Sequence, residues 1–366
     1  MKIKGYIKIS IQIILTATML ISCNNNNTND GGTDNGQLDG ENNGTEKPTD
    51  EQTNQPVPAT VCYTANESGS ISVIDLETNK VVNSIKTDGV THNVQVSPDS
   101  KILAATVAVP MDENNQMNEM NMNGRVLFYD TETNELINQV EVGNHPAHVD
   151  FTRDGKYAVV ANNEDNTVSI IDMSNYKVIE TIETGEGPHG LRITRDSTLA
   201  FVANMGEDSV SIISLVNFSE LNKRTLGKTP VTTAIAPDDV TVLATLNGED
   251  ALAIYSMSSG AIDKVNVGKG PAQVFIQSDG RYAFVANQGT EESPTNTVSK
   301  VNMETKAVEA TIEVGNGAHG VVISEDNKFV YITNIYDATV SVIDNSTNEV
   351  VATIPVDKEP NGITLK

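Results

Sequence analysis

Five histidines and four methionines are the residues of this chain best suited to bind a transition metal. The histidines stand at or just before the starts of short apolar runs: His92, His145, His148, His189 and His319. The methionines lie in the segment from Pro110 to Gly124, as Met111, Met117, Met120 and Met122. Imidazole binds copper in either oxidation state, and soft thioether sulfur selects Cu(I). These residues predict a copper site, on the condition that the fold brings them together.

A unit of about 40 residues repeats from Val61 to Lys366 and predicts the elements that position these side chains. Its clearest copies read VVANNEDNTVSIID, FVANMGEDSVSIIS and YITNIYDATVSVID. Each copy holds four short runs in which apolar and polar residues alternate, and β-branched residues are frequent, which indicates strands rather than helices. Four antiparallel strands in each of seven units predict an all-β fold, a seven-bladed β-propeller.

The two ends of the repeat region are both incomplete. The seventh first-strand run, Gly362 to Leu365, has no strands after it, whereas the run from Val61 to Ala65 has no first strand before it. We therefore expect the two ends to share one blade, which pairs strand edges that would otherwise stay open. In such a ring the starts of the first strands gather around one mouth of the central channel, so histidines distant in sequence are expected to approach one another there.

The N-terminal residues predict export and membrane anchoring. Residues 1–22 combine early lysines with a short apolar run, which is typical of a signal peptide. The sequence Leu-Ile-Ser-Cys, which ends at Cys23, resembles the lipobox of bacterial lipoproteins. That resemblance implies a diacylglycerol on Cys23 and contact with a membrane through this lipid. Asn24 stands where inner-membrane lipoproteins often carry Asp, so the resemblance implies the outer membrane or cell surface.

Residues 23–60 are predicted to form a disordered tether, and residues 61–366 are predicted to form the propeller. The tether is rich in Asn, Thr, Gly and Asp, and it holds too little apolar surface to offset its ordering entropy. The whole chain has 49 acidic and 24 basic residues and a net charge of −25, which argues against nucleic acid as a partner. Once Cys23 is lipidated, Cys62 has no partner for an intramolecular disulfide. We also expect the propeller to be monomeric.

The repeats resemble a known family. The segments VVAN, FVAN and YITN, followed by SIID, SIIS and SVID, and the links EGPHGLRITRD and NGAHGVVISED are similar to those of the YVTN-repeat, surface-layer-like β-propellers of bacteria and archaea. The resemblance implies the seven-bladed fold and little about activity. Because a histidine followed by glycine belongs to the family's repeat, it also implies that His189 and His319 serve turn geometry and hydrogen bonding.

Three functional hypotheses follow. The sequence has no glycine-rich phosphate loop, CxxC pair or GxSxG motif, so the first is a non-enzymatic scaffold at the cell envelope that binds a protein or other ligand through one face. The alternative is a copper-binding or redox-associated propeller. A third is a lactonase-like hydrolase, because seven-bladed lactonases have a similar repeat style; its candidate residues are Asp150, His189 and Arg192.

Overall fold

The computed structural model describes residue 58 and the ranges 60–109 and 123–366. The predicted signal peptide, Cys23 and the predicted tether as far as residue 57 lie outside the described residues. The same is true of Met111, Met117, Met120 and Met122. Within the described part of the chain, no helix is both long enough and apolar enough to cross a bilayer.

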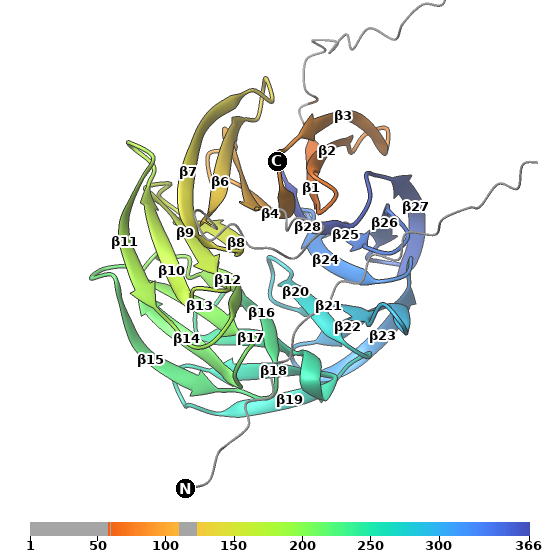
Figure 1. Ribbon diagram of the computed structural model, residues 1–366. Coiled ribbons are helices and arrows are strands. Elements are labelled where there is room, and N and C mark those ends of the chain that lie inside the picture. Colours follow the sequence, from red (N-terminus) through yellow and green to blue (C-terminus); the bar gives the residue numbers. More distant parts are fainter. Residues whose placement is uncertain (1–57, 59, 110–122) are drawn as a thin grey trace, which may run out of the picture. The chain divides into compact units, whose positions relative to one another are not determined.

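The described part of the chain folds into seven antiparallel sheets of four strands each, arranged as blades around one axis (Figure 1). The strands nearest the axis are β28 (Pro360–Leu365), β4 (Val90–Val96), β8 (Pro146–Phe151), β12 (Pro188–Ile193), β16 (Pro230–Ile235), β20 (Pro271–Ile276) and β24 (Ala318–Ile323). This architecture confirms the predicted seven-bladed propeller.

Three further strands complete each blade, numbered outward from the axis. The second strands are β1 (Val61–Asn66), β5 (Ile102–Ala108), β9 (Tyr157–Asn162), β13 (Leu199–Asn204), β17 (Thr241–Leu246), β21 (Tyr282–Gly289) and β25 (Phe329–Asn334). The third strands are β2 (Ser70–Asp75), β6 (Asn123–Asp130), β10 (Thr167–Asp172), β14 (Ser209–Ser214), β18 (Ala251–Ser256), β22 (Pro294–Asn302) and β26 (Thr339–Asp344). The outermost strands are β3 (Lys80–Lys86), β7 (Leu136–Asn144), β11 (Lys177–Glu183), β15 (Ser219–Thr225), β19 (Ile262–Asn266), β23 (Ala307–Glu313) and β27 (Glu349–Pro355). A 3-10 turn, η1 (Asn247–Glu249), links β17 to β18.

Burial decreases from the axis outward. In one blade, β13 and β14 are almost wholly buried, whereas β15 is mostly exposed. The apolar side chains of neighbouring blades pack face to face, and Tyr63, Phe128, Phe201 and Phe284 are among the largest that are fully buried. The core is therefore divided among the interfaces between blades, which keeps the inner strands at fixed positions.

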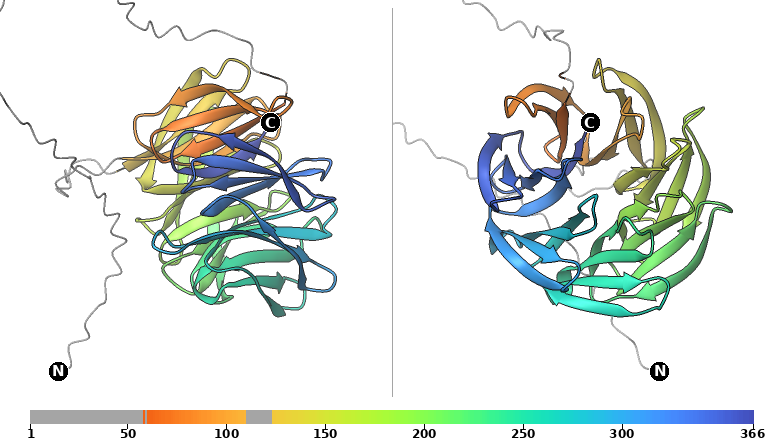
Figure 2. Two further views of the ribbon diagram at one scale, coloured as in Figure 1. Left: turned by 90° about the vertical axis from the view of Figure 1, so that its right-hand side faces the viewer. Right: turned by 180° about the vertical axis from the view of Figure 1, so that it is seen from behind.

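The two ends of the propeller complete one blade, as the incomplete repeats predicted. Strand β28 pairs with β1 in an antiparallel register that sets Leu365 opposite Cys62 and Thr364 opposite Tyr63. The back view in Figure 2 shows the C-terminal strand lying beside the first strands of the chain. Cys62 is buried in this blade as a free thiol.

Candidate metal centre

Three neighbouring inner strands, β4, β8 and β12, each bring one histidine to the same end of the axis. Thr106 on β5 holds the first two strands together, because its hydroxyl donates to Ala147 O at 2.7 Å and accepts from Asn93 N at 3.0 Å. Asn93 follows His92 and Ala147 precedes His148 in the chain, so this one side chain fixes the backbone on which both imidazoles are mounted.

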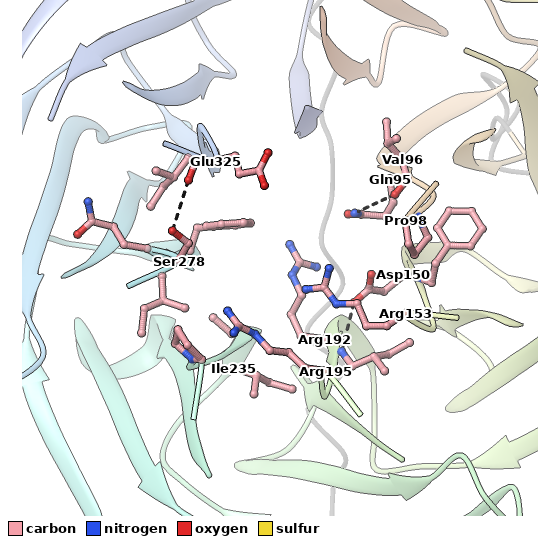
Figure 3. Close-up of a pocket in the computed structure, with 18 of the residues that line it drawn as sticks. Gln95, Val96, Pro98, Asp150, Arg153, Arg192, Arg195, Ile235, Ser278 and Glu325 are labelled. Atoms are coloured by element: carbon pink, nitrogen blue, oxygen red, sulfur yellow. Dashed lines mark hydrogen bonds between the residues drawn. The ribbon is translucent and has the colours of Figure 1, made fainter. Parts of the chain in front are cut away.

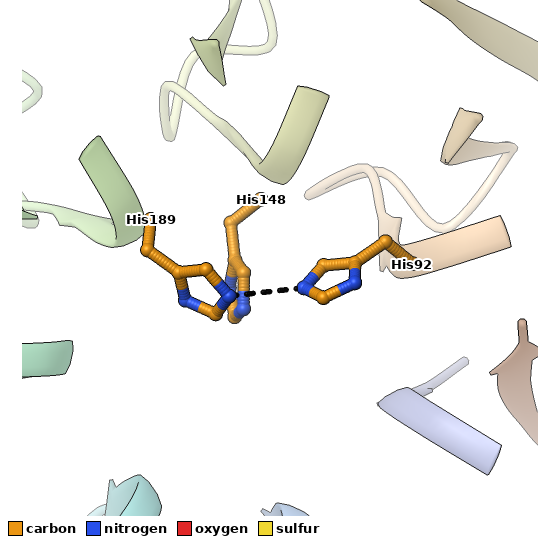
Figure 4. Close-up of side chains that lie close together, drawn as sticks. All are labelled: His92, His148 and His189. Atoms are coloured by element: carbon orange, nitrogen blue, oxygen red, sulfur yellow. Dashed lines mark hydrogen bonds between the residues drawn. The ribbon is translucent and has the colours of Figure 1, made fainter. Parts of the chain in front are cut away.

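The imidazoles of His92, His148 and His189 converge on one point (Figure 4). Each offers a ring nitrogen, and the three nitrogens lie within 4.8 Å of one another. The shortest separation, between His92 Nε2 and His189 Nε2, is 3.1 Å. Two nitrogens bound to one tetrahedral zinc at about 2.0–2.1 Å are about 3.3–3.4 Å apart, so little movement is needed for joint ligation.

Hydrogen bonds behind the rings determine which nitrogens are free. His92 Nδ1 lies 2.9 Å from Glu67 Oε1, and His189 Nδ1 lies 3.1 Å from Val231 O. A carboxylate and a carbonyl only accept, so both Nδ1 atoms are assigned the proton, and in the neutral rings both Nε2 atoms carry lone pairs. With both rings neutral no proton lies between these two nitrogens at 3.1 Å, whereas a proton on one of them or a cation bound to both would join them.

His148 is the least satisfied member of the cluster. Its side chain is 0% exposed, and within the described part of the chain neither ring nitrogen has a hydrogen-bond partner. Burial lowers the pKa of His148 well below its usual value, and the nearby His189 and His92 lower it further. The pKa of His189 is also well below the usual value, chiefly because of burial. Neutral imidazole is the form that binds a metal ion.

Glu67 supports the cluster from the link between β1 and β2. Burial opposes its ionisation, but the hydrogen bond and charge of His92 outweigh this and lower the pKa of Glu67 to about 2. Asn361 Nδ2 also donates to Glu67 Oε1 at 2.7 Å. A carboxylate that accepts from the outer nitrogen of a histidine is a typical second partner of a metal ligand.

The other two histidines do not join the cluster. His145 is the single residue between β7 and β8, has φ of 48°, and is 3.6 Å from Glu164 Oε1 through Nδ1. Its side chain is 39% exposed and its ring centroid lies 6.1 Å from that of His92. His319 Nδ1 instead lies 3.5 Å from Gln273 Nε2 on β20, and burial lowers the pKa of His319 to about 4.

One residue of this site, Glu67, is absent from the sequence prediction. Glu67 was not a candidate, although the corresponding residues after other second strands are Asn163, Met205 and Ile335, so a departure from the repeat marks it. His148 lies one position later in its strand than His92 and His189 do in theirs. In β8 it occupies the position that Gly190 occupies in β12, directly before the residue that resumes pairing with the second strand. A side chain does not fit at Gly190 in β12, because a Cβ there would lie 2.5 Å from Thr232 Cα.

The residues of the lactonase hypothesis are divided between the two ends of the axis. Asp150 and Arg192 line a cavity at the far ends of the inner strands, and His189 is not among the residues that line it. Asp150 Oδ2 accepts from Ile193 N at 3.2 Å, and Oδ1 accepts from Phe151 N at 2.9 Å. The three predicted residues do not share one site.

Comparison with known proteins agrees with the fold. Residues 51–168 match the family model of the Choice-of-anchor I domain, and residues 271–362 match that of the Cytochrome D1 heme domain. No curated protein matches the chain.

Many solved structures are similar. Hydrazine Synthase from Kuenenia stuttgartiensis is 20% identical over 74% of this chain and 88% of its own, with a TM-score of 0.65. A functionally unknown protein from Desulfotomaculum acetoxidans DSM 771 is 14% identical over 83% and 98%, with a TM-score of 0.70. A proposed 6-phosphogluconolactonase from Bacteroides uniformis ATCC 8492 is 15% identical over 84% and 99%, with a TM-score of 0.65. The chain shares its fold with these proteins.

The histidine cluster does not fit a heme that is held between two of its histidines. If two of the three nitrogens took the axial positions on opposite faces, the third, within 4.8 Å of both, would lie where the flat macrocycle has to be. The segment matched to the heme domain also contains none of His92, His148 and His189. The donor set and its spacing suit a single ion.

Proposed function

We propose that this protein is a β-propeller of the cell envelope that binds one transition-metal ion through His92, His148 and His189. The observation that carries the proposal is the convergence of three imidazoles, one of which is buried with both nitrogens unpartnered among the described residues. Burying such a group costs free energy unless something binds it. Three histidines from one face also leave a coordination position open for a further ligand.

Copper is the ion that we favour, because of the methionine segment. Ala108, just before the segment, pairs with Val90 at the start of β4. On its other side, Gly124 lies against Pro146 at the start of β8. The chain thus leaves and re-enters the described structure beside the strands that carry His92 and His148. Met111, Met117, Met120 and Met122 stay a prediction as additional thioether ligands for Cu(I).

Metal content tests the proposal. Protein purified without chelators is loaded with Cu(II), Cu(I) under reducing conditions, or Zn(II), dialysed, and its metal is measured by elemental analysis. We expect one tightly held ion per chain in the wild type and its loss in His148→Ala, a substitution that removes no hydrogen bond within the described residues. His319→Gln is the matched control and should retain the ion. A wild type that holds no ion, or a His148→Ala variant that holds it equally well, would refute the site.

The envelope location is proposed on the sequence alone. The support is the lipobox-like sequence ending at Cys23 and the polar segment after it. Mass spectrometry of the mature N-terminus should find a diacylglyceryl cysteine, and Cys23→Ser should release the protein from the membrane fraction. An unmodified Cys23 would contradict the anchor without affecting the metal site. The hypothesis of a scaffold that binds a protein or other ligand through one face of the ring is compatible with both results, because neither experiment alters such a face.

A further inference from the structure

A second site lies at the opposite end of the axis from the histidines. There the last residues of the inner strands and the turns after them surround a cavity of about 310 Å³ (Figure 3). This volume is at the small end of the range of about 300–1,000 Å³ that is typical of ligand pockets. The cavity is therefore large enough for a small organic molecule.

Three arginines from two adjacent blades face this cavity. Arg192 lies near the end of β12, and Arg153 and Arg195 follow β8 and β12. Figure 3 shows their side chains reaching over the cavity, with Glu325 across from them. The corresponding turn residue is Pro98 or Pro237 in other blades, so the repeat does not require arginine here. The cations are concentrated on one side of the ring.

The three guanidinium groups form no ion pair with a carboxylate in the described part of the chain. Among the described residues, no carboxylate oxygen lies within 4.0 Å of them, whereas Arg125 is paired with Asp88 at 2.8 Å. The protein has about twice as many acidic as basic residues, 49 against 24, yet three of its six arginines line this one cavity. Like charges at close range raise the free energy of the folded state unless an anion neutralises them.

Asp150 and Glu325 cancel only part of this charge, because the lining holds three guanidiniums and two carboxylates. Both Asp150 oxygens already accept backbone N–H groups, and burial raises the pKa of this carboxyl against the opposing effect of Arg192. Glu325 is a single carboxylate against three guanidiniums. The cavity is therefore positive, in contrast to the protein as a whole.

One more polar group in the cavity lacks a partner. The side chain of Gln277 is on the cavity wall and only 3% exposed, and its Oε1 has no hydrogen-bond partner among the described residues. An amide oxygen only accepts, so its missing partner is an O–H or N–H donor. A buried acceptor left without a donor costs free energy.

We propose that this cavity binds a small organic polyanion, with carboxylate or phosphate groups for the arginines and a hydroxyl group for Gln277. Guanidinium presents a planar fork of donors that matches the two oxygens of a carboxylate or phosphate. Three such groups around a small cavity favour two or more anionic groups in one molecule. The site is separate from the metal centre and does not depend on it.

Calorimetric titration of the full chain tests the proposal with two probes. Citrate supplies carboxylates and a hydroxyl, and glycerol 3-phosphate supplies a phosphate and hydroxyls; binding by either supports the proposal and identifies the anionic group. Arg195→Gln, in an exposed turn, and Arg192→Gln should each weaken binding about tenfold or more. Arg224→Gln, on the exposed strand β15, is the matched control and should change nothing. Tricarballylate, which is citrate without its hydroxyl, should bind more weakly than citrate.

Two results would overturn this site. One is the absence of binding of both probes at millimolar concentration and low ionic strength. The other is an equal effect of Arg195→Gln and Arg224→Gln, since both remove one positive charge but only Arg195 lines the cavity. The titration is repeated with His148→Ala that has been stripped of metal with EDTA and then dialysed free of it, where binding should persist. Loss of binding in that variant would mean that the anion is held by the metal centre instead.

Discussion

Two hydrogen bonds behind the histidines decide which ring nitrogens are available to a metal. Glu67 accepts from His92 Nδ1 and the Val231 carbonyl accepts from His189 Nδ1, so both rings turn Nε2 toward the centre of the cluster. Residue types alone did not predict this, because each nitrogen of a free imidazole is equally able to bind. The orientation of these rings therefore depends on residues outside the cluster.

Glu67→Gln should weaken metal binding while leaving the three ligands in place. Glutamine keeps the size of the side chain but loses the charge that orients His92 and raises its basicity, and losses of about 10- to 100-fold in metal affinity are usual for such partners. Competition with a chelator of known affinity measures the effect. Glu183→Gln, on the exposed strand β11, is the control, and an equal affinity in both variants would contradict a supporting role for Glu67.

His319 should make the metal-free protein lose stability in acid. Burial lowers the pKa of His319 in the folded state to about 4, whereas an unfolded histidine titrates near about 6.5. Between these values the unfolded chain binds more protons, so the free energy of unfolding falls as pH decreases from about 6.5 to about 4, by about 3 kcal/mol in full.

Urea denaturation in EDTA at pH 7.5 and pH 4.5 measures this loss. His319→Gln, which keeps a polar group beside Gln273, should lose less stability between the two pH values than the wild type does. The loss of stability that remains in that variant is due to protonation of His148 and His189, whose pKa values are also lowered by burial. An identical loss in both proteins would show that His319 does not titrate as its burial indicates.

At the scale of the blade, the repeated asparagine is the residue that joins the second and third strands. Asn204 Nδ2 donates to Ser209 Oγ at 2.9 Å and to Ser211 Oγ at 3.0 Å. The same pattern of one amide and two hydroxyls occurs at Asn66, Asn162, Asn287 and Asn334. The asparagine that ends the VVAN, FVAN and YITN segments therefore has a structural role.

Asn204→Ala should destabilise the propeller by about 1–3 kcal/mol, because it leaves buried hydroxyls without their donor. Urea denaturation monitored by circular dichroism gives the free energy of unfolding. Asn222→Ala, on the exposed strand β15, should be within about 0.5 kcal/mol of the wild type. If the two alanine variants were equally stable, the hydrogen bonds at Asn204 would not contribute to the blade.

The strands themselves follow closely from the repeat, with one informative difference. The segment from Gly289 to Asn296 is an insertion relative to other copies, so the repeat predicts no strand for it. In the structure β21 continues to Gly289 and β22 begins at Pro294, with Gly289 opposite Pro294. The added residues lengthen a hairpin instead of forming an open loop, because antiparallel pairing satisfies their backbone groups.

For the whole molecule, closure of the ring depends on one terminal strand. Deletion of residues 360–366 removes β28, exposes the edge of β1 and leaves the inner edge of the first blade open. Because every blade packs on two neighbours, we expect cooperative loss of stability across the propeller, not only at its end. Differential scanning calorimetry should show a lower melting temperature and a smaller unfolding enthalpy.

A peptide of residues 358–366 provides the control for this deletion. Added in trans, it should pair with β1 by strand addition and restore part of the lost melting temperature. A scrambled peptide should not. A truncated protein with the melting temperature of the full chain would contradict closure by β28.

The sequence alone was sufficient for the fold, because a period of about 40 residues with four strand patterns per copy admits few architectures. It also predicted the shared blade, since two incomplete repeats at opposite ends complement each other. The sequence did not decide which histidines meet. His92 and His319 occupy equivalent places in the repeat, yet one faces His189 and the other faces Gln273.

Only the tertiary structure made that choice, because it decides which side chains meet across the axis. His92 on β4 meets His189 on β12 although the blade of β8 lies between theirs, whereas His319 on β24 meets Gln273 on the neighbouring β20. The tertiary structure also brings together Arg153, Arg192 and Arg195. The sequence did not predict an anion site at these residues, because a net charge of −25 argues against anionic ligands. Charge composition is a sum over the whole chain, whereas a site is decided by the few residues that the ring brings to one end of its axis.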